Sequence, residues 1–165
     1  MSTVSIWRFE TSDGAEAALG ALERLQERRV VVIEDAAVLV WGAGERRPYG
    51  YQVGSADGVS ALSGAFWGLL FGLLFLLPLA GAAEDLGVLA RVGLSDQFLA
   101  HARDWITVGT SALFLFTDRA AVDRLRETLI GADLLVCTID EQHDTALRRA
   151  FDAGTDDGTE LDRHA

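Results

Sequence analysis

The chain has 165 residues and a formal net charge of −11, with 50% hydrophobic and 24% charged residues. This length suits one ordinary domain with a real core, and the composition excludes both a disordered chain and an all-membrane bundle. The acidic balance argues against nucleic acid as a partner, because affinity for nucleic acid depends on lysine and arginine. The opening residues carry no basic segment followed by an apolar stretch, which favours a non-secreted protein.

The beginning of the chain predicts a strand followed by a helix. Residues 4–9 form a short apolar and aromatic run that ends in turn residues. Asp13 and Glu16 then have the spacing of a capping box, with Asp in place of the usual Ser or Thr. Apolar residues recur after them at three and four positions, as on one face of a helix that ends near Arg28.

Two β-rich runs and a hairpin follow this helix. Residues 30–33 and 36–41 lie on either side of Glu34 and Asp35, as one bent strand or two short ones, and residues 49–53 predict the returning strand of a hairpin. Neighbouring residues on a strand point to opposite faces of the sheet. The two carboxylates are therefore not expected to share acid–base chemistry.

The last third repeats the opening pattern. Residues 111–116 form a nearly continuous apolar strand, Asp118 caps a helix that Gly131 ends, and residues 134–139 form another strand. A final helix carries Leu147, Ala150 and Phe151.

These patterns predict an α+β protein with a ferredoxin-like, split βαβ sheet, interrupted by an apolar glycine-rich helix or helical hairpin. We expect residues 1–151 to form a single domain with the helical insert at about 58–94. The acidic tail at 152–165 has too little apolar area to offset chain entropy, so we expect it to be disordered.

The insert contains an uncharged segment, residues 61–83, that is long enough to cross a bilayer as a helix. Small residues recur in it at every fourth position, so that in a helix they line one stripe where another backbone can approach closely. This stripe is the predicted site of helix packing and self-association. Its members are Ser60, Gly64, Gly68 and Gly72.

Large apolar side chains cover the other faces of the same predicted helix. We expect them to contact a membrane or a protein interface, because a helix with three glycines needs tertiary, oligomeric or lipid contacts to persist. The residues concerned are Phe66, Trp67, Leu70, Phe71, Leu74 and Phe75.

Three placements of the segment remain open. The first is a hairpin that dips into or lies on the membrane, broken at Pro78 and Gly81, with residues 86–94 turning back. The second is a helix buried against its own domain or against another copy, and the third is a single span. Residues 95–106 are amphipathic and predict a helix that covers the sheet, or alternatively one that lies on a membrane surface.

No arrangement of residues in the sequence predicts catalysis. The histidines are too isolated for a zinc site, and His143 beside Glu141 and Asp144 reads as a solvated cluster. Cys137 lies in an apolar run, where a small buried thiol is expected. We therefore expect a protein that is not an enzyme and has no cofactor and no metal.

Residues 34–38, 64–75 and 109–114 together resemble a bacterial family of predicted membrane proteins, domain-of-unknown-function family 1269. Members of this family place a glycine-rich helical insert between two such halves. The resemblance covers about residues 4–139. It implies membrane association and no catalytic residues.

The functional expectation is a structural or binding protein that self-associates through the glycine stripe, on the cytoplasmic side of the cell inner membrane. Its expected partners are further copies of itself and possible membrane lipid. The alternative is a cytoplasmic homo-oligomer that binds a small ligand or has a regulatory role and buries the apolar helix at subunit contacts.

Overall fold

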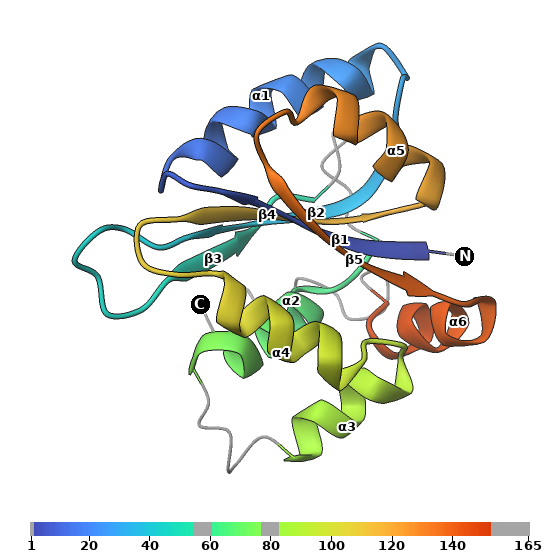
Figure 1. The fold of residues 1–165 in the computed structure, drawn as a ribbon. Coiled ribbons are helices and arrows are strands. Elements are labelled where there is room, and N and C mark those ends of the chain that lie inside the picture. Colours follow the sequence, from blue (N-terminus) through green and yellow to red (C-terminus); the bar gives the residue numbers. More distant parts are fainter. Residues whose placement is uncertain (1, 55–60, 77–82, 153–165) are drawn as a thin grey trace, which may run out of the picture.

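The computed structural model describes residues 2–54, 61–76 and 83–152. Ser60, Pro78, Gly81 and nearly all of the predicted acidic tail lie outside these ranges. The described residues form five strands, six α-helices and one π-helical turn (Figure 1). In chain order these are β1 (Ser2–Phe9), α1 (Gly14–Glu27), β2 (Ile33–Val40), β3 (Tyr49–Gln52), α2 (Gly64–Phe71), the π-helical η1 (Gly72–Leu76), α3 (Ala83–Arg91), α4 (Asp96–Trp105), β4 (Ser111–Thr117), α5 (Arg119–Thr128), β5 (Asp133–Ile139) and α6 (Glu141–Ala150).

The five strands form one antiparallel sheet in the order β3-β2-β4-β1-β5. Strand β4, from the last third of the chain, lies between β1 and β2 from the first third. Because the two ends of the chain interleave in this way, the helices between them are an insertion into a continuous sheet. The α+β class and the predicted hairpin of β2 and β3 are confirmed.

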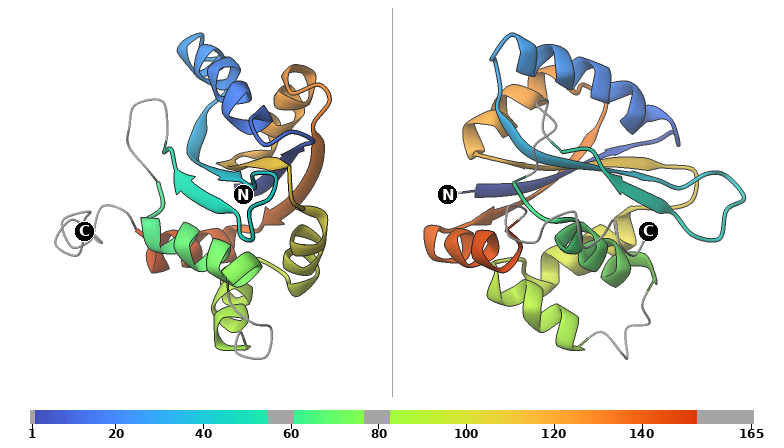
Figure 2. Two further views of the ribbon diagram at one scale, coloured as in Figure 1. Left: turned by 90° about the vertical axis from the view of Figure 1, so that its left-hand side faces the viewer. Right: turned by 180° about the vertical axis from the view of Figure 1, so that it is seen from behind.

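Helices cover both faces of the sheet (Figures 1 and 2). Helices α1 and α5 lie on one face, and α2, α3, α4 and α6 lie on the other. Central strand β4 shows the consequence, because Ala112, Phe114 and Phe116 join the core beneath the inserted helices while Leu113 and Leu115 join the core beneath α1 and α5. A strand buried on both faces reads as a continuous apolar run, which explains the sequence of β4.

The helix ends match the predictions in one place and differ in another. Asp118 caps α5 as predicted, since its Oδ1 accepts a hydrogen bond from the Ala121 N–H at 2.8 Å. The predicted capping box at α1 is wrong, because the Asp13 side chain makes no cap hydrogen bond. Glu16 instead accepts a hydrogen bond from the Tyr51 hydroxyl at 2.8 Å, and so links α1 to the edge strand β3.

Strand β2 begins later than the sequence predicts and contains a bulge. Residues 30–32 precede the strand, and Val32 is 69% exposed. The pairing of β2 with β4 shifts register between Ile33 and Asp35. Ile33 therefore joins the core beneath α1, while Asp35 is aligned with Phe116 of the opposite core. Without the bulge these two side chains would point to the same face.

The apolar segment is not helical from its first residue, since residues 61–63 precede the helix. Helix α2 begins only at Gly64 and continues into η1, which ends at Leu76. In the parts of the chain that the structure describes, every helix is too short or too polar to cross a membrane, so none corresponds to the predicted single span. Helix α4 covers the sheet as predicted, with Phe98, Leu99 and Ala102 buried.

Candidate functional site

Helix α2 and η1 pack with their bulky face on the sheet of the same chain. Of the residues predicted to contact a membrane or an interface, five are at most 9% exposed and the sixth packs against the same core. In this structure these side chains pack against the sheet of their own chain. The five buried residues are Phe66, Trp67, Leu70, Phe71 and Leu74, and the partly buried one is Phe75.

A cluster of aromatic rings fixes this helix on the sheet. Phe66 makes edge contacts with Trp67 at 4.9 Å and with Phe151, after α6, at 5.4 Å between ring centroids. Phe114 of β4 makes T-shaped contacts with Trp67 at 6.4 Å and with Phe71 at 5.0 Å between ring centroids. Such edge-to-face pairs add stability beyond the area that they bury. The cluster joins α2 to the centre of the sheet and to the end of α6.

The glycine stripe lies on the outer side of α2. Gly68 is exposed, and Gly64 and Gly72 are half-buried. A Cβ atom built on Gly68 or on Gly72 would meet no atom within 4 Å. Among the described residues these two glycines are therefore not needed for packing, and their backbone is open to a second molecule.

A groove lies beside this stripe, between α2 and the edge strand β3. Its volume is about 330 Å³ and its lining is mostly apolar. Gly50 is required on its β3 side, because a Cβ there would lie 2.5 Å from ring atoms of Phe71. The lining residues are Leu39, Pro48, Tyr49, Gly50, Gly68, Phe71 and Phe75.

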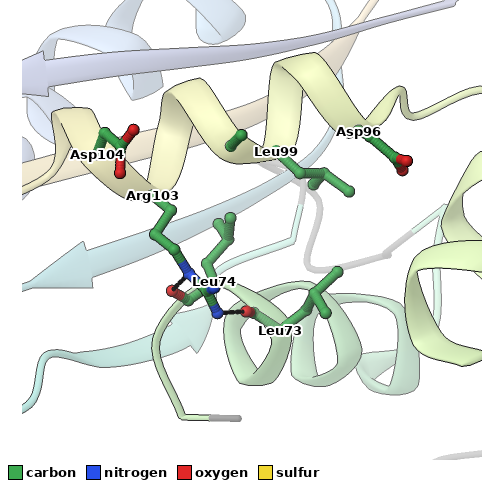
Figure 3. A pocket seen from close by; sticks show the side chains of 7 residues that line it. Leu73, Leu74, Asp96, Leu99, Arg103 and Asp104 are labelled. Atoms are coloured by element: carbon green, nitrogen blue, oxygen red, sulfur yellow. Dashed lines mark hydrogen bonds between the residues drawn. The ribbon is translucent and has the colours of Figure 1, made fainter. Parts of the chain in front are cut away.

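A second cleft of about 320 Å³ lies on the other side, between η1 and α4 (Figure 3). Arg103 reaches from α4 to η1 and donates hydrogen bonds to the carbonyl oxygens of Leu73 and Leu74, the latter at 2.7 Å. The last carbonyls of a helical segment have no partner within it, and a cation there is favourable. Arg103 therefore stabilises the end of η1. The lining residues are Leu73, Leu74, Asp96, Leu99, Ala100, Arg103 and Asp104.

Asp35 joins the start of the insert to the sheet. Its carboxylate is fully buried and accepts hydrogen bonds from the backbone N–H of Ala36 at 2.8 Å and of Leu62 at 3.0 Å. The side-chain amide of Gln52 donates to both carboxylate oxygens, at 3.2 and 3.1 Å, and to the Leu62 carbonyl at 2.9 Å. Burial raises the pKa of Asp35, although these donors act to lower it.

The indole of Trp67 lies close to this carboxylate. It contributes to lowering the pKa of Asp35, yet its N–H is buried and makes no good hydrogen bond within the described residues. We interpret it as near the carboxylate with poor alignment, because an electrostatic effect tolerates geometry that a hydrogen bond does not. The role of Asp35 was missed from the sequence, where the one signal was an acid inside an apolar β run.

The predicted opposite orientation of Glu34 and Asp35 is wrong, because the bulge breaks the alternation and Glu34 contacts α6 on the face of the sheet that the insert covers. Glu34 forms an ion pair with Arg148 of α6 at 3.0 Å, and Arg148 also binds Asp144 at 2.9 Å. The Arg148 guanidinium lies 5.1 Å from the centre of the Phe116 ring, and hydrogen bonding to Glu34 raises its pKa. The side chain is 39% exposed, so the ion pair contributes little to stability and chiefly positions α6.

The other residues that the sequence singled out lie apart from the insert's outer surface. Cys137 is buried as predicted, its thiol donates to the Gly93 carbonyl at 3.4 Å, and burial raises its pKa. His143 is exposed and pairs with Asp140 at 2.8 Å. Across the described ranges, no three histidine, cysteine or acidic side chains gather closely enough to hold a metal ion.

Comparison with known proteins gives one match. The model of a family described as "Protein of unknown function (DUF1269)" matches residues 61–152, more than half of the chain. The match runs from the start of the insert to the end of α6, whereas the resemblance in the sequence was placed at residues 4–139. No curated protein and no solved structure matches the chain significantly. On this match, the chain belongs to the family described as "Protein of unknown function (DUF1269)".

Proposed function

We propose that this chain is a non-enzymatic structural or binding protein that self-associates through the glycine stripe of α2 and η1. The observation that carries the proposal is the open backbone at Gly68 and Gly72, where an added Cβ would meet nothing. Within the described residues, these glycines have no packing role that would explain them. Each costs about 1 kcal/mol of helix stability relative to alanine, so a close contact with a second helix offers a compensating gain.

We also infer that the sheet is ferredoxin-like, with β3 added at one edge. Two strand–helix–strand units, β1-α1-β2 and β4-α5-β5, supply four of the five strands. Their strands interleave in the order β2-β4-β1-β5, with every neighbouring pair antiparallel. This arrangement supports a split βαβ architecture, in which the helical insert fills the face that the two unit helices leave open.

The Gly68→Leu substitution tests the self-association. We expect it to raise the dissociation constant of the oligomer at least about tenfold, because the new side chain separates two backbones that otherwise touch, a loss of about 1.4 kcal/mol. Size-exclusion chromatography with light scattering, over a range of protein concentrations, measures the effect.

Gly20→Leu is the matched control for this substitution. Gly20 also lies inside a helix, on the opposite layer, and a Cβ there would meet only the end of the flexible Arg24 side chain at 3.9 Å. We expect this variant to keep the oligomer size of the original protein. A protein that is monomeric at all concentrations, or an oligomer that Gly68→Leu leaves unchanged, would contradict the proposal.

The second part of the proposal is attachment at the cytoplasmic side of the inner membrane, through surface contact of the insert. Its support is the absence of charge over residues 61–83. We expect the full chain to float with vesicles of phosphatidylethanolamine and phosphatidylglycerol in a density gradient. Phe75→Glu should weaken flotation, because Phe75 is only partly buried in the predicted contact face. Val108→Glu, at a 52% exposed position after α4, is the control.

A second candidate is a homo-oligomer that binds a small ligand, and the cleft between η1 and α4 favours it. Its floor consists of leucines, and its rim carries Asp96, Arg103 and Asp104 (Figure 3). A few polar groups around an apolar floor are typical of small-molecule sites. The flotation experiment separates the two candidates. If the protein stays entirely at the bottom of the gradient, membrane attachment is rejected and the ligand-binding homo-oligomer is favoured.

A further inference from the structure

We propose that the free edge of strand β5 is a second self-association surface, where β5 of another copy pairs antiparallel and continues the sheet across a two-fold axis. The occupant is a second copy of this chain. The inference goes beyond association through the glycine stripe and does not depend on it. The stripe lies beside edge strand β3, whereas β5 is the opposite edge of the sheet.

Strand β5 has one paired side and one open side. It pairs with β1 over seven residues, from Asp133 to Ile139, and no described residue pairs with its other side. In an edge strand the N–H and C=O groups of every second residue point away from the sheet. A second extended strand matches this row, because it repeats donors and acceptors at the same spacing. The backbone of the edge therefore specifies a β-strand as its occupant.

Strand β5 lacks the features that usually keep edge strands apart, which are short length, bulges, prolines and charges. Its pairing with β1 runs without a register shift, and it contains no proline or lysine. Its one charged residue, Asp133, lies at the start of the strand and pairs with Arg8 at 2.8 Å. By contrast, β3 at the other edge has four residues and directly follows Pro48. The edge of β5 is thus the one that accepts a further strand.

The middle of β5 is apolar and incompletely buried. Leu134, Leu135 and Val136 are half-buried, although they are central residues of the strand. A hollow of about 620 Å³ lies between them and the end of α5, and Ile130 beside it is 84% exposed. A second strand on this edge would cover these side chains, and the buried apolar area adds to the backbone hydrogen bonds.

This apolar run is self-complementary about Leu135. A two-fold axis there sets Leu135 opposite its own copy and Leu134 opposite the other copy's Val136. Residues directly opposite in an antiparallel pair lie on the same face, so all three half-buried side chains meet apolar ones. An axis at Val136 would instead set Leu134 opposite the exposed Thr138. The symmetry of the run favours another copy of this chain over an unrelated strand.

The charges beside β5 allow two copies to approach. The chain has a net charge of −11, so two copies repel each other overall. At this edge Arg8 neutralises Asp133, Arg119 reaches a hydroxyl of β5 at 3.3 Å, Arg126 lines the hollow, and Asp140 follows the strand. Three arginines and two aspartates are close to balance. This edge is therefore free of the acidic excess that opposes self-association.

Hydrogen exchange of the full chain, resolved by residue with NMR, tests the pairing. In an open edge strand, the β5 amides that point away from β1 exchange about as fast as exposed loop amides. We expect these amides to exchange at least about tenfold more slowly in samples where light scattering detects a dimer or a larger species. The β1 amides serve as the internal reference.

Three outcomes of this measurement would overturn the proposal. The first is fast exchange of the outward β5 amides in an oligomeric sample. The second is slow exchange in a monomeric sample, which would show that a further segment of the same chain covers the edge. The third is a protein that stays monomeric with fast exchange at every concentration.

Leu134→Lys tests the surface by mutation, because a lysine on an edge strand blocks pairing. We expect it to raise the dissociation constant of the β5 contact at least about tenfold and to remove the protection of the outward amides. Val32→Lys is the matched control. It adds the same charge at a 69% exposed position before β2, and it should keep both the oligomer size and the protection.

The two self-association surfaces can fail separately. Slow exchange of the outward β5 amides that persists in Gly68→Leu supports β5 pairing whatever happens at the glycine stripe. Protection that is intact in a folded Leu134→Lys protein overturns β5 pairing, while Gly68→Leu still tests the stripe. If Leu134→Lys does not fold, the exchange measurement on the original protein decides.

Discussion

Replacing Phe66 with alanine is expected to lower the free energy of unfolding by about 3–5 kcal/mol. Phe66 is fully buried and packs its ring against Trp67 and Phe151, so the substitution leaves a cavity where α2, the sheet and the end of α6 meet. Urea denaturation without detergent, followed by circular dichroism, measures the loss. The size of the effect shows whether the insert is part of the cooperative core.

Ile130→Ala is the control, since Ile130 is a large apolar residue that is 84% exposed. A substitution at such a position should change stability by no more than about 0.5 kcal/mol. If Phe66→Ala costs no more than Ile130→Ala, the aromatic face of α2 does not contribute to the folded core in solution, and its packing on the sheet would be wrong.

Gly50→Ala is expected to destabilise the protein by about 1–3 kcal/mol, through overpacking. The added Cβ would lie 2.5 Å from two ring atoms of Phe71, so either the ring or strand β3 must move. Edge strand β3 is short, and its residues Tyr49 and Gly50 line one side of the groove. We therefore expect the same variant to alter the fluorescence of the nearby Trp67, which contacts Phe71 at 6.2 Å between centroids.

A double substitution isolates this contact. Phe71→Leu shortens the side chain that meets the added methyl group, so Gly50→Ala should cost less in that background than in the original protein. Strictly additive losses would show that the two residues do not touch. Gly20→Ala is the control for the loss of a glycine, and it should stabilise α1 by up to about 1 kcal/mol, because its Cβ meets only the end of Arg24.

The type of each strand and helix, and their order along the chain, could be predicted from the sequence because the signals are local. The apolar run of β4, the cap at Asp118 and the hairpin of β2 and β3 each depend on neighbouring residues. Local preference fails where a distant group competes. Asp13 is a residue type that often caps helices, and Glu16 has capping-box spacing from it. In the structure, however, Asp13 makes no cap hydrogen bond, and Glu16 accepts a hydrogen bond from the Tyr51 hydroxyl.

The candidate site was predicted only in outline. Periodicity separated the glycine stripe from the bulky faces of α2, and the structure keeps these two sets on different sides of the helix. Periodicity cannot say what each side contacts, because an apolar face suits a sheet, a lipid or another subunit equally well. Asp35 was overlooked for a related reason, since its partners Gln52 and Leu62 come together only in the folded chain.

The sequence by itself determined that the chain is an α+β protein with an uncharged, glycine-spaced helix between two strand–helix–strand units. The composition and the spacing of apolar residues predict these elements, because each residue must suit the helix or strand in which it lies. Only the tertiary structure decided that the bulky side of this helix is buried on its own sheet, with Gly68 facing outward and a bulge turning Asp35 towards the insert. Those outcomes depend on which surfaces pack together. The hydrophobic effect is not directional, so an apolar face alone does not determine which surface will bury it.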